Sequence, residues 1–231
     1  MNNEDKKEKP DLLKQMSGVV GHEIRNPLAI ISNSLYFIKT KLGANGAALD
    51  PKIAKHLGII EGEVKHTNEV IEEMLTFTRT RELQRAPASV NAALKDLAGA
   101  YPVPPAVTLK LEADPADPCV NADMDAIGYA LRCVLTNAVQ ALPEGGLVTL
   151  ACTHDEKLAH LTCTDSGPGL PGGDGEKVFE PFFTTKPRGI GLGLPIARKL
   201  LEQQGGTLKA ENAPGGGTRV TLSLPLDGPR T

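Results

Sequence analysis

Gly21-His22-Glu23-Ile24-Arg25-Asn26-Pro27-Leu28 is the stretch that decides the fold of the first part of this 231-residue chain. It lies within a pattern in which apolar residues recur at intervals of three and four, a spacing typical of a helix–helix seam. At roughly 100° per residue, His22 lies about 160° around the helix from that apolar stripe, so it faces solvent or a partner rather than the seam. The seam residues are Ile24, Leu28, Ile31, Leu35, Ile38 and Leu42.

A second helix with the same spacing follows a short turn. Asp50-Pro51 is a typical helix start, with a capping side chain and a proline at the first helical position. A lone hairpin of two such helices leaves much of its seam in water, whereas two hairpins paired as a four-helix bundle bury it, so we expect a homodimer. The alternative is a hairpin that packs on the second half of its own chain. The second seam comprises Ile53, Leu57, Ile60, Val64, Thr67, Ile71 and Leu75 and fades near Leu83.

Beyond residue 85 the pattern changes to short strands and helices. Strands and helices do not alternate strictly, which disfavours a doubly wound nucleotide fold, and helices against a mixed or antiparallel sheet predict an α+β sandwich. The predicted domains are a tail at 1–10, a helical domain at 11–85, an α/β-sandwich domain at 86–226 and a tail at 227–231. We expect helices at 90–101, 123–142 and 194–204, and strands at 107–111, 147–152, 158–164, 207–211 and 218–224.

The composition disfavours several classes of function. A net charge of −3 with 3% aromatic residues is unlike a nucleic-acid-binding surface. The sequence has no apolar run of the roughly twenty residues that a membrane span needs, and no signal-peptide pattern opens it. We therefore expect a cytoplasmic location. The cysteines are scattered and are expected to be small core residues in a reducing compartment rather than metal ligands: Cys119, Cys133, Cys152 and Cys163.

Two polar segments of the second half have the features of a nucleotide pocket. Asn137 lies in a buried-looking helix and needs a partner for its amide, such as a phosphate-bound Mg²⁺. Asp165-Ser166-Gly167-Pro168-Gly169 follows a strand, where a carboxylate can accept a hydrogen bond from the exocyclic amine of adenine. Its glycines allow the backbone to approach a flat ring. Taken singly, the asparagine also fits an ordinary satisfied helix residue, and the glycine segment fits a simple turn.

Two further segments are rich in glycine. Gly189-Ile190-Gly191-Leu192-Gly193 leads into a helix, whose free N–H groups and positive dipole end suit a phosphate. Lys186 and Arg188 lie just upstream as charge partners for a triphosphate. Gly216-Gly217-Thr218 is either a plain hairpin turn or a segment whose threonine closes the pocket through its hydroxyl or a water.

Together these segments resemble the catalytic core of a two-component sensor histidine kinase. The order and spacing agree from about Met16 to Leu224. The residues of the H and F boxes are most similar to those of the subgroup of nitrogen-regulation and dicarboxylate sensors. The matching motifs are His22–Leu28 for the H box, Asn137 for the N box, Asp165–Gly169 for the G1 box, Phe179–Lys186 for the F box and Gly189–Gly193 for the G2 box.

The resemblance implies a dimeric four-helix bundle that carries the histidine, joined to an ATP-binding domain of the Bergerat type. By this resemblance His22 takes the phosphoryl group of Mg-ATP with the support of Glu23, and passes it to an aspartate of a response regulator. Asn26 matches the position that orients water when such kinases dephosphorylate that partner. The resemblance assigns ATP contacts to Asn137, which also meets the metal, and to Gln140, Asp165, Gly167, Gly169, Lys186, Arg188, Gly189, Gly191, Leu192, Gly193 and Thr218.

Pro27 interrupts the hydrogen bond to the carbonyl of Glu23, and our hypothesis is that the resulting kink lets the helix bend beside His22. Cys133 stands where relatives often have a second asparagine, and the short span from Lys186 to Gly189 predicts a compact ATP lid. This stretch of sequence has no sensor region, so either a partner delivers the signal or the chain is the core of a longer kinase. Two alternatives stay open: an ATP-independent phosphotransfer scaffold, and another Bergerat ATPase such as an anti-sigma-type serine kinase or a MutL-like clamp.

Overall fold

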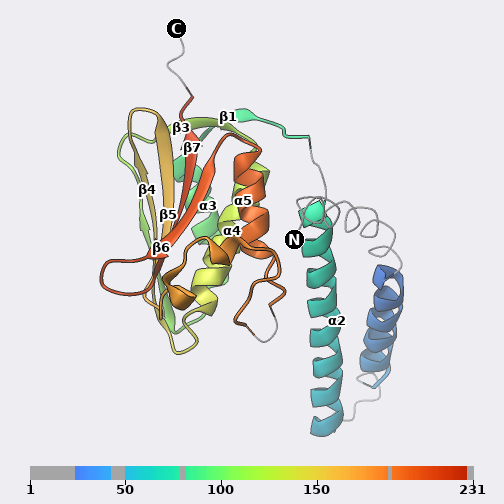
Figure 1. Ribbon diagram of the computed structural model, residues 1–231. Helices are drawn as coiled ribbons and strands as arrows, with labels where there is room; N and C mark the ends of the chain where they lie inside the picture. The colour runs from blue at the N-terminus through green and yellow to red at the C-terminus, as the bar shows by residue number, and fades with distance from the viewer. Residues whose placement is uncertain (1–23, 43–49, 79–81, 187–188, 228–231) are drawn as a thin grey trace, which may run out of the picture. The chain divides into compact units, whose positions relative to one another are not determined.

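The computed structural model describes residues 24–42, 50–78, 82–186 and 189–227, and the chain divides into two compact units between Thr80 and Arg81. The first unit is a pair of helices and the second is an α/β domain (Figure 1). Three predicted site residues, His22, Glu23 and Arg188, lie outside the described residues, as do the predicted tail at 1–10 and most of the tail at 227–231. The predicted domain boundary at residue 85 stays a prediction.

The first unit pairs the helix at residues 24–42 with α2 (Pro51–Thr78). Asp50 caps α2, since its Oδ1 accepts from the N–H of Lys52 at 2.7 Å. Two ion pairs join the helices in antiparallel order, Arg25 with Glu72 and Lys39 with Glu61. Among the described helices, none combines the length and the apolar character that a membrane span requires. The buried seam residues are Leu35, Leu57, Val64, Ile71 and Leu75.

The second unit contains a five-stranded sheet in the order β2-β4-β5-β7-β6. The strands β2 (Val107–Glu112) and β4 (Gly146–His154) are parallel, and the other neighbours are antiparallel. The sheet is therefore mixed, which is one of the two arrangements that the sequence predicted. The remaining strands are β5 (Leu158–Asp165), β6 (Thr207–Asn212) and β7 (Thr218–Pro225).

A second, two-stranded sheet was not predicted. It pairs β1 (Ala86–Ser89) with β3 (Cys119–Ala122) in antiparallel register. Each strand has only four residues, too few to show an alternating apolar pattern, and β1 contains Pro87.

Three helices cover one face of the large sheet: α3 (Val90–Ala100), α4 (Met124–Gln140) and α5 (Gly193–Glu202) (Figure 1). Two short 3₁₀ turns, η1 (Pro171–Gly173) and η2 (Lys177–Phe179), lie between β5 and α5. Alternate residues of β5 and β7 are buried, and they form one core with the apolar residues of the helices, as a half-solvated sheet requires. The predicted α+β sandwich is confirmed.

Buried polar contacts fix the start of α4. The Asp123 carboxylate accepts from the N–H of Ala126 and, through its other oxygen, from the N–H of Gln84, both at 3.0 Å. The N–H of Asp123 donates to Oε1 of the buried Gln204 at 2.6 Å. The helix is thus capped and tied to the end of α5, with Gln140 at its far end.

His154 and His160 each make defined side-chain contacts. His154 Nδ1 lies 2.6 Å from Asp114 Oδ2, and this hydrogen bond is the main reason why the pKa of Asp114 is lowered. His160 lies between Ser223 and Asp155, with Nδ1 2.8 Å from the hydroxyl and Nε2 3.2 Å from the carboxylate.

The turn between β4 and β5 offers a test of stability against pH. The Asp155 carboxylate accepts from the N–H groups of Lys157 and Leu158 at 2.8 Å, and these bonds with that of His160 lower its pKa from 3.8 to about 2. A lowered pKa stabilises the fold above the unfolded-state value, and this contribution is lost as the pH falls through the folded-state value. Asp155→Asn should therefore destabilise the protein at neutral pH, with the difference from wild type shrinking as the pH falls from about 4 towards about 2.

Urea denaturation at a series of pH values measures this difference. Glu156→Gln, at the exposed neighbouring position, is the matched control and should show no such trend. A destabilisation by Asp155→Asn that stays constant down to the acid end of the series would contradict the prediction.

Candidate functional site

Asp165, the last residue of β5, lies at the centre of the candidate site. Its Oδ1 accepts from the N–H of Gly167 at 2.8 Å and from the N–H of Thr218 at 3.1 Å, and the residue is only 5% exposed. These bonds join the loop after β5 to the start of β7. Within the described residues both bonds end on Oδ1, which leaves Oδ2 to accept from a bound ligand.

Gly217 approaches the same strand end so closely that only glycine fits. A Cβ there would collide with the carbonyl oxygen of Asp165 and lie 3.1 Å from the nitrogen of Gly167, and its φ is +86°. The neighbouring Thr218 contributes its backbone N–H to Asp165, whereas the sequence suggested its hydroxyl. The Gly216-Gly217-Thr218 segment is therefore part of the site as well as a turn.

Asn212, at the end of β6, holds the loop after Asp165, and the sequence analysis missed it. Its Oδ1 accepts from the N–H of Leu170 at 2.8 Å, and a Cβ on Gly169 would lie 2.7 Å from the same oxygen. The available signal was an asparagine directly before a Pro/Gly-rich turn, a position where its amide often bonds backbone.

The predicted F and G2 boxes pack on each other through backbone. The N–H of Phe182 donates to the carbonyl of Gly191 at 3.0 Å, and a Cβ on Gly191 would lie 2.5 Å from the carbonyl oxygen of Phe183. Phe182 has a φ of +68°, which is rare for a bulky residue. Leu192 is buried, so its backbone rather than its side chain is available to a ligand. Gly193 begins α5.

Arg198 of α5 contacts the segment that contains η2, and this residue was not predicted either. Its guanidinium lies 4.3 Å from the centroid of the Phe179 ring and donates to both carboxylate oxygens of Glu176, at 2.8 and 3.0 Å. These cation–π and bidentate contacts attach η2 to α5.

Lys186 makes the contact between the predicted F box and the helix of the predicted N box. Its ammonium donates to Oδ1 of Asn137 at 2.5 Å and to Oε1 of Gln140 at 2.7 Å, both on α4. Burial lowers the pKa of Lys186, and the charge of Asp165 opposes that shift. The turn that follows is short, since the N–H of Gly189 donates back to the carbonyl of Lys186 at 3.2 Å.

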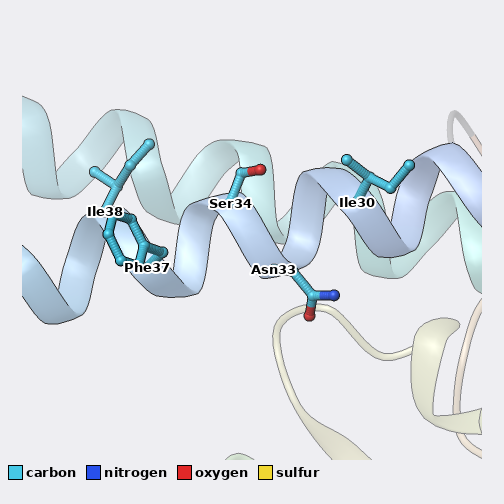
Figure 2. A pocket seen from close by; sticks show the side chains of 5 residues that line it. All are labelled: Ile30, Asn33, Ser34, Phe37 and Ile38. Atoms are coloured by element: carbon cyan, nitrogen blue, oxygen red, sulfur yellow. The ribbon is translucent and has the colours of Figure 1, made fainter.

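On the helical unit the structure describes one predicted catalytic residue, Asn26, which is exposed. Pro27 lies in the same helix and is exposed as well. Further along this helix a shallow groove contains two large apolar side chains that are more than half exposed, Ile30 and Phe37. Figure 2 shows the residues that line it: Ile30, Asn33, Ser34, Phe37 and Ile38.

Both units match known families. Residues 12–83 match the His Kinase A (phospho-acceptor) domain, and residues 122–228 match the histidine kinase-, DNA gyrase B- and HSP90-like ATPases. The sensor histidine kinase ZraS of Klebsiella oxytoca is 31% identical over 227 residues, which cover 96% of this chain. The two matched domains together form the catalytic core of a two-component histidine kinase.

Other histidine kinases cover the chain to a similar extent. Sporulation kinase C of Bacillus subtilis is 27% identical over 95% of the chain. The chain spans about half the length of these relatives, 48% of ZraS and 50% of sporulation kinase C. The relatives are compatible with the subgroup that the sequence predicted.

Solved histidine kinase structures share the fold. The structure of ThkA in complex with the response regulator TrrA has a TM-score of 0.70 and 27% identity, covering 96% of this chain and 64% of that one. Full-length ShkA in complex with AMPPNP has a TM-score of 0.77 over 92% of this chain and 46% of that one; at 22% identity it supports the fold alone.

The contact at Gly217 gives a prediction about stability. Gly217→Ala must displace the carbonyl of Asp165, so it should lower the free energy of unfolding by about 1–3 kcal/mol in urea denaturation. Gly128→Ala in α4 is the control, because a Cβ there meets nothing within 4 Å; it should leave stability unchanged or raise it by up to about 1 kcal/mol. A Gly217→Ala protein as stable as wild type would contradict the close approach.

Proposed function

We propose that this chain is an ATP-dependent protein histidine kinase that phosphorylates His22 and passes the phosphoryl group to an aspartate of a response regulator, which it also dephosphorylates. One observation carries the proposal: Asp165 has one carboxylate oxygen fixed by two N–H groups and the other left for a ligand, beside a backbone approach that only Gly217 allows. The same chain carries a phospho-acceptor domain match that includes His22.

The candidate site has groups that fit both the adenine and the phosphates of ATP. Asp165 Oδ2 would accept from the exocyclic amine of adenine, and the backbone at Gly167 and Gly169 would lie against the ring. The phosphates would meet the N–H groups at the start of α5, which begins at Gly193 and where the helix dipole favours negative charge.

The residues present also fit Mg²⁺. The amide oxygen of Asn137 accepts from one cationic group, the ammonium of Lys186, and a neutral oxygen is a ligand that Mg²⁺ accepts. Asn137 would hold the metal beside the phosphates. When bound, Mg²⁺ neutralises phosphate charge and polarises the phosphoryl group.

In the transfer, a ring nitrogen of His22 would form a bond to the γ-phosphorus while the bond from that phosphorus to the bridging oxygen breaks and ADP leaves. A histidine with the reference pKa of about 6.5 is mostly neutral near pH 7 and therefore nucleophilic. Glu23 would accept a hydrogen bond from the other ring nitrogen and stabilise the cation that develops. The aspartate of the response regulator would then take the phosphoryl group, and Asn26 would orient water for its removal.

The surface of the helical unit supports a response regulator as partner. Ile30, Asn33 and Phe37 follow Asn26 at helical spacing, on the side of the helix where the sequence places His22. Exposed apolar patches of this kind mark interaction sites. A receiver domain that reaches His22 would cover the groove of Figure 2, and ThkA was solved with such a partner.

The exposed apolar residues of the predicted helical seam support a homodimer. Several predicted seam residues remain 37–48% exposed in the single chain, so the hairpin does not bury its own apolar stripe. A second copy that completes a four-helix bundle would cover them. These residues are Ile24, Ile31, Ile38, Leu42, Ile53 and Ile60.

The central test is labelling with [γ-³²P]ATP. The wild-type chain should acquire label that is lost in acid, and His22→Gln should acquire none. His56→Gln, at an exposed position of α2, is the control and should label like wild type. Acid-stable label would indicate a serine kinase, and a wild-type chain without label would indicate a scaffold that only relays phosphate.

A separate prediction concerns the dimer. Ile31→Glu would place an unpaired charge in the bundle core and should weaken dimerisation by about two orders of magnitude or more, giving monomer in light scattering coupled to gel filtration. Tyr36→Glu is the control, because Tyr36 is 73% exposed and lies off the seam. A dimer that survives Ile31→Glu would place the interface elsewhere.

A further inference from the structure

The contact between Lys186 and α4 has a feature that phosphate binding does not explain. The ammonium donates to two side-chain amide oxygens three residues apart, Asn137 Oδ1 at 2.5 Å and Gln140 Oε1 at 2.7 Å. Residues at this spacing lie on one side of a helix, so their oxygens converge on a single point. Lys186 fills that point with a positive charge.

That point coincides with the metal position of the proposed function. Asn137 Oδ1 is the oxygen that would bind Mg²⁺, and an ammonium within hydrogen-bond distance of it occupies the space and the lone pairs that the metal needs. Two cations sharing these oxygens would also repel each other strongly in a partly buried pocket. Lys186 and Mg²⁺ therefore exclude each other at Asn137.

We propose that the ammonium of Lys186 acts as an internal substitute for Mg²⁺ in the nucleotide-free pocket, so that the metal enters only when Lys186 leaves Asn137 and Gln140. This inference rests on the proposed function. It makes Lys186 a residue with two positions: on the α4 amides before loading, and free to neutralise phosphate afterwards.

The surrounding contacts make such an exchange feasible. Lys186 is the last residue of the predicted F box, and its N–H donates to the Thr184 hydroxyl at 3.1 Å. Its carbonyl accepts from the N–H of Gly189. The two amide oxygens lie on the well-packed helix α4. The lysine thus sits on a loop and its acceptors on a rigid element, so departure of the ammonium needs no change in the core.

Binding of a fluorescent ADP analogue to the full chain, in excess Mg²⁺ and in EDTA, tests the exchange. The quantity measured is the ratio of the Kd in EDTA to the Kd in Mg²⁺. In wild type the metal must displace the lysine, whereas in Lys186→Met it need not, so the ratio should rise by about tenfold, the equivalent of one charged hydrogen bond. If Lys186 acts only on phosphates, both Kd values rise together and the ratio stays at the wild-type value, which would overturn the inference.

Two further variants sharpen the test. Lys186→Arg keeps the cation and should keep the ratio within about threefold of wild type, which is less than the loss of a charged hydrogen bond. Gln140→Leu removes one of the two acceptors and should raise the ratio by a smaller factor than Lys186→Met. Gln140 lies at the exposed end of α4, so this variant carries the test if Lys186→Met does not fold.

The outcomes separate the two proposals. A wild-type chain that binds no nucleotide in either buffer would overturn the proposed function. A wild-type chain that binds with a clear Mg²⁺ dependence, together with variants whose ratio does not change, would overturn only the role of Lys186. A ratio raised equally by Lys186→Arg and Lys186→Met would also overturn it, because the retained charge would then have no effect.

Discussion

The buried carboxylate of Asp123 fixes helix α4, and the candidate site depends on that helix. Each of its oxygens accepts a backbone N–H, one from the first turn of α4 and one from Gln84. The apolar side of α4, including Leu131 and Leu135, is buried against the sheet. A helix fixed at one end and packed along its length places Asn137 and Gln140 at a constant position near the end of β5. The amides that accept from Lys186 are therefore held in place by the packing of the core.

The regular elements of the second unit were predictable from the sequence because each has a local signature. The alternating apolar residues of β5 and β7 and the capped amphipathic pattern of α4 are present within single segments. The strands β1 and β3 were missed, because four residues are too few to carry such a signature. Their pairing joins residues 30 to 36 positions apart, which a local pattern cannot show.

The candidate site was predictable in its residue types but not in its contacts. Asp165 and its glycines alone also fit a simple turn, and they were singled out because they match the G1 box in order and spacing with the other motifs. The partners of Asn137 and Lys186 could not be inferred, since both an ammonium and a bound ion fit the same amide oxygen. Arg198 and Asn212 were missed for a further reason: each contacts a segment distant in the sequence.

The hydrogen bond between Phe182 and Gly191 closes the base of the loop that contains Lys186. On one side the chain is held by Arg198 through η2, and on the other it continues directly into α5. The two ends of this loop are thus fixed by contacts that do not depend on how long the loop is. Doubling the length of a flexible loop between fixed ends costs only about 0.6 kcal/mol of closure entropy. Insertions and deletions can therefore accumulate in this loop during evolution with little loss of stability, so its length can diverge while the contacts at its base are retained.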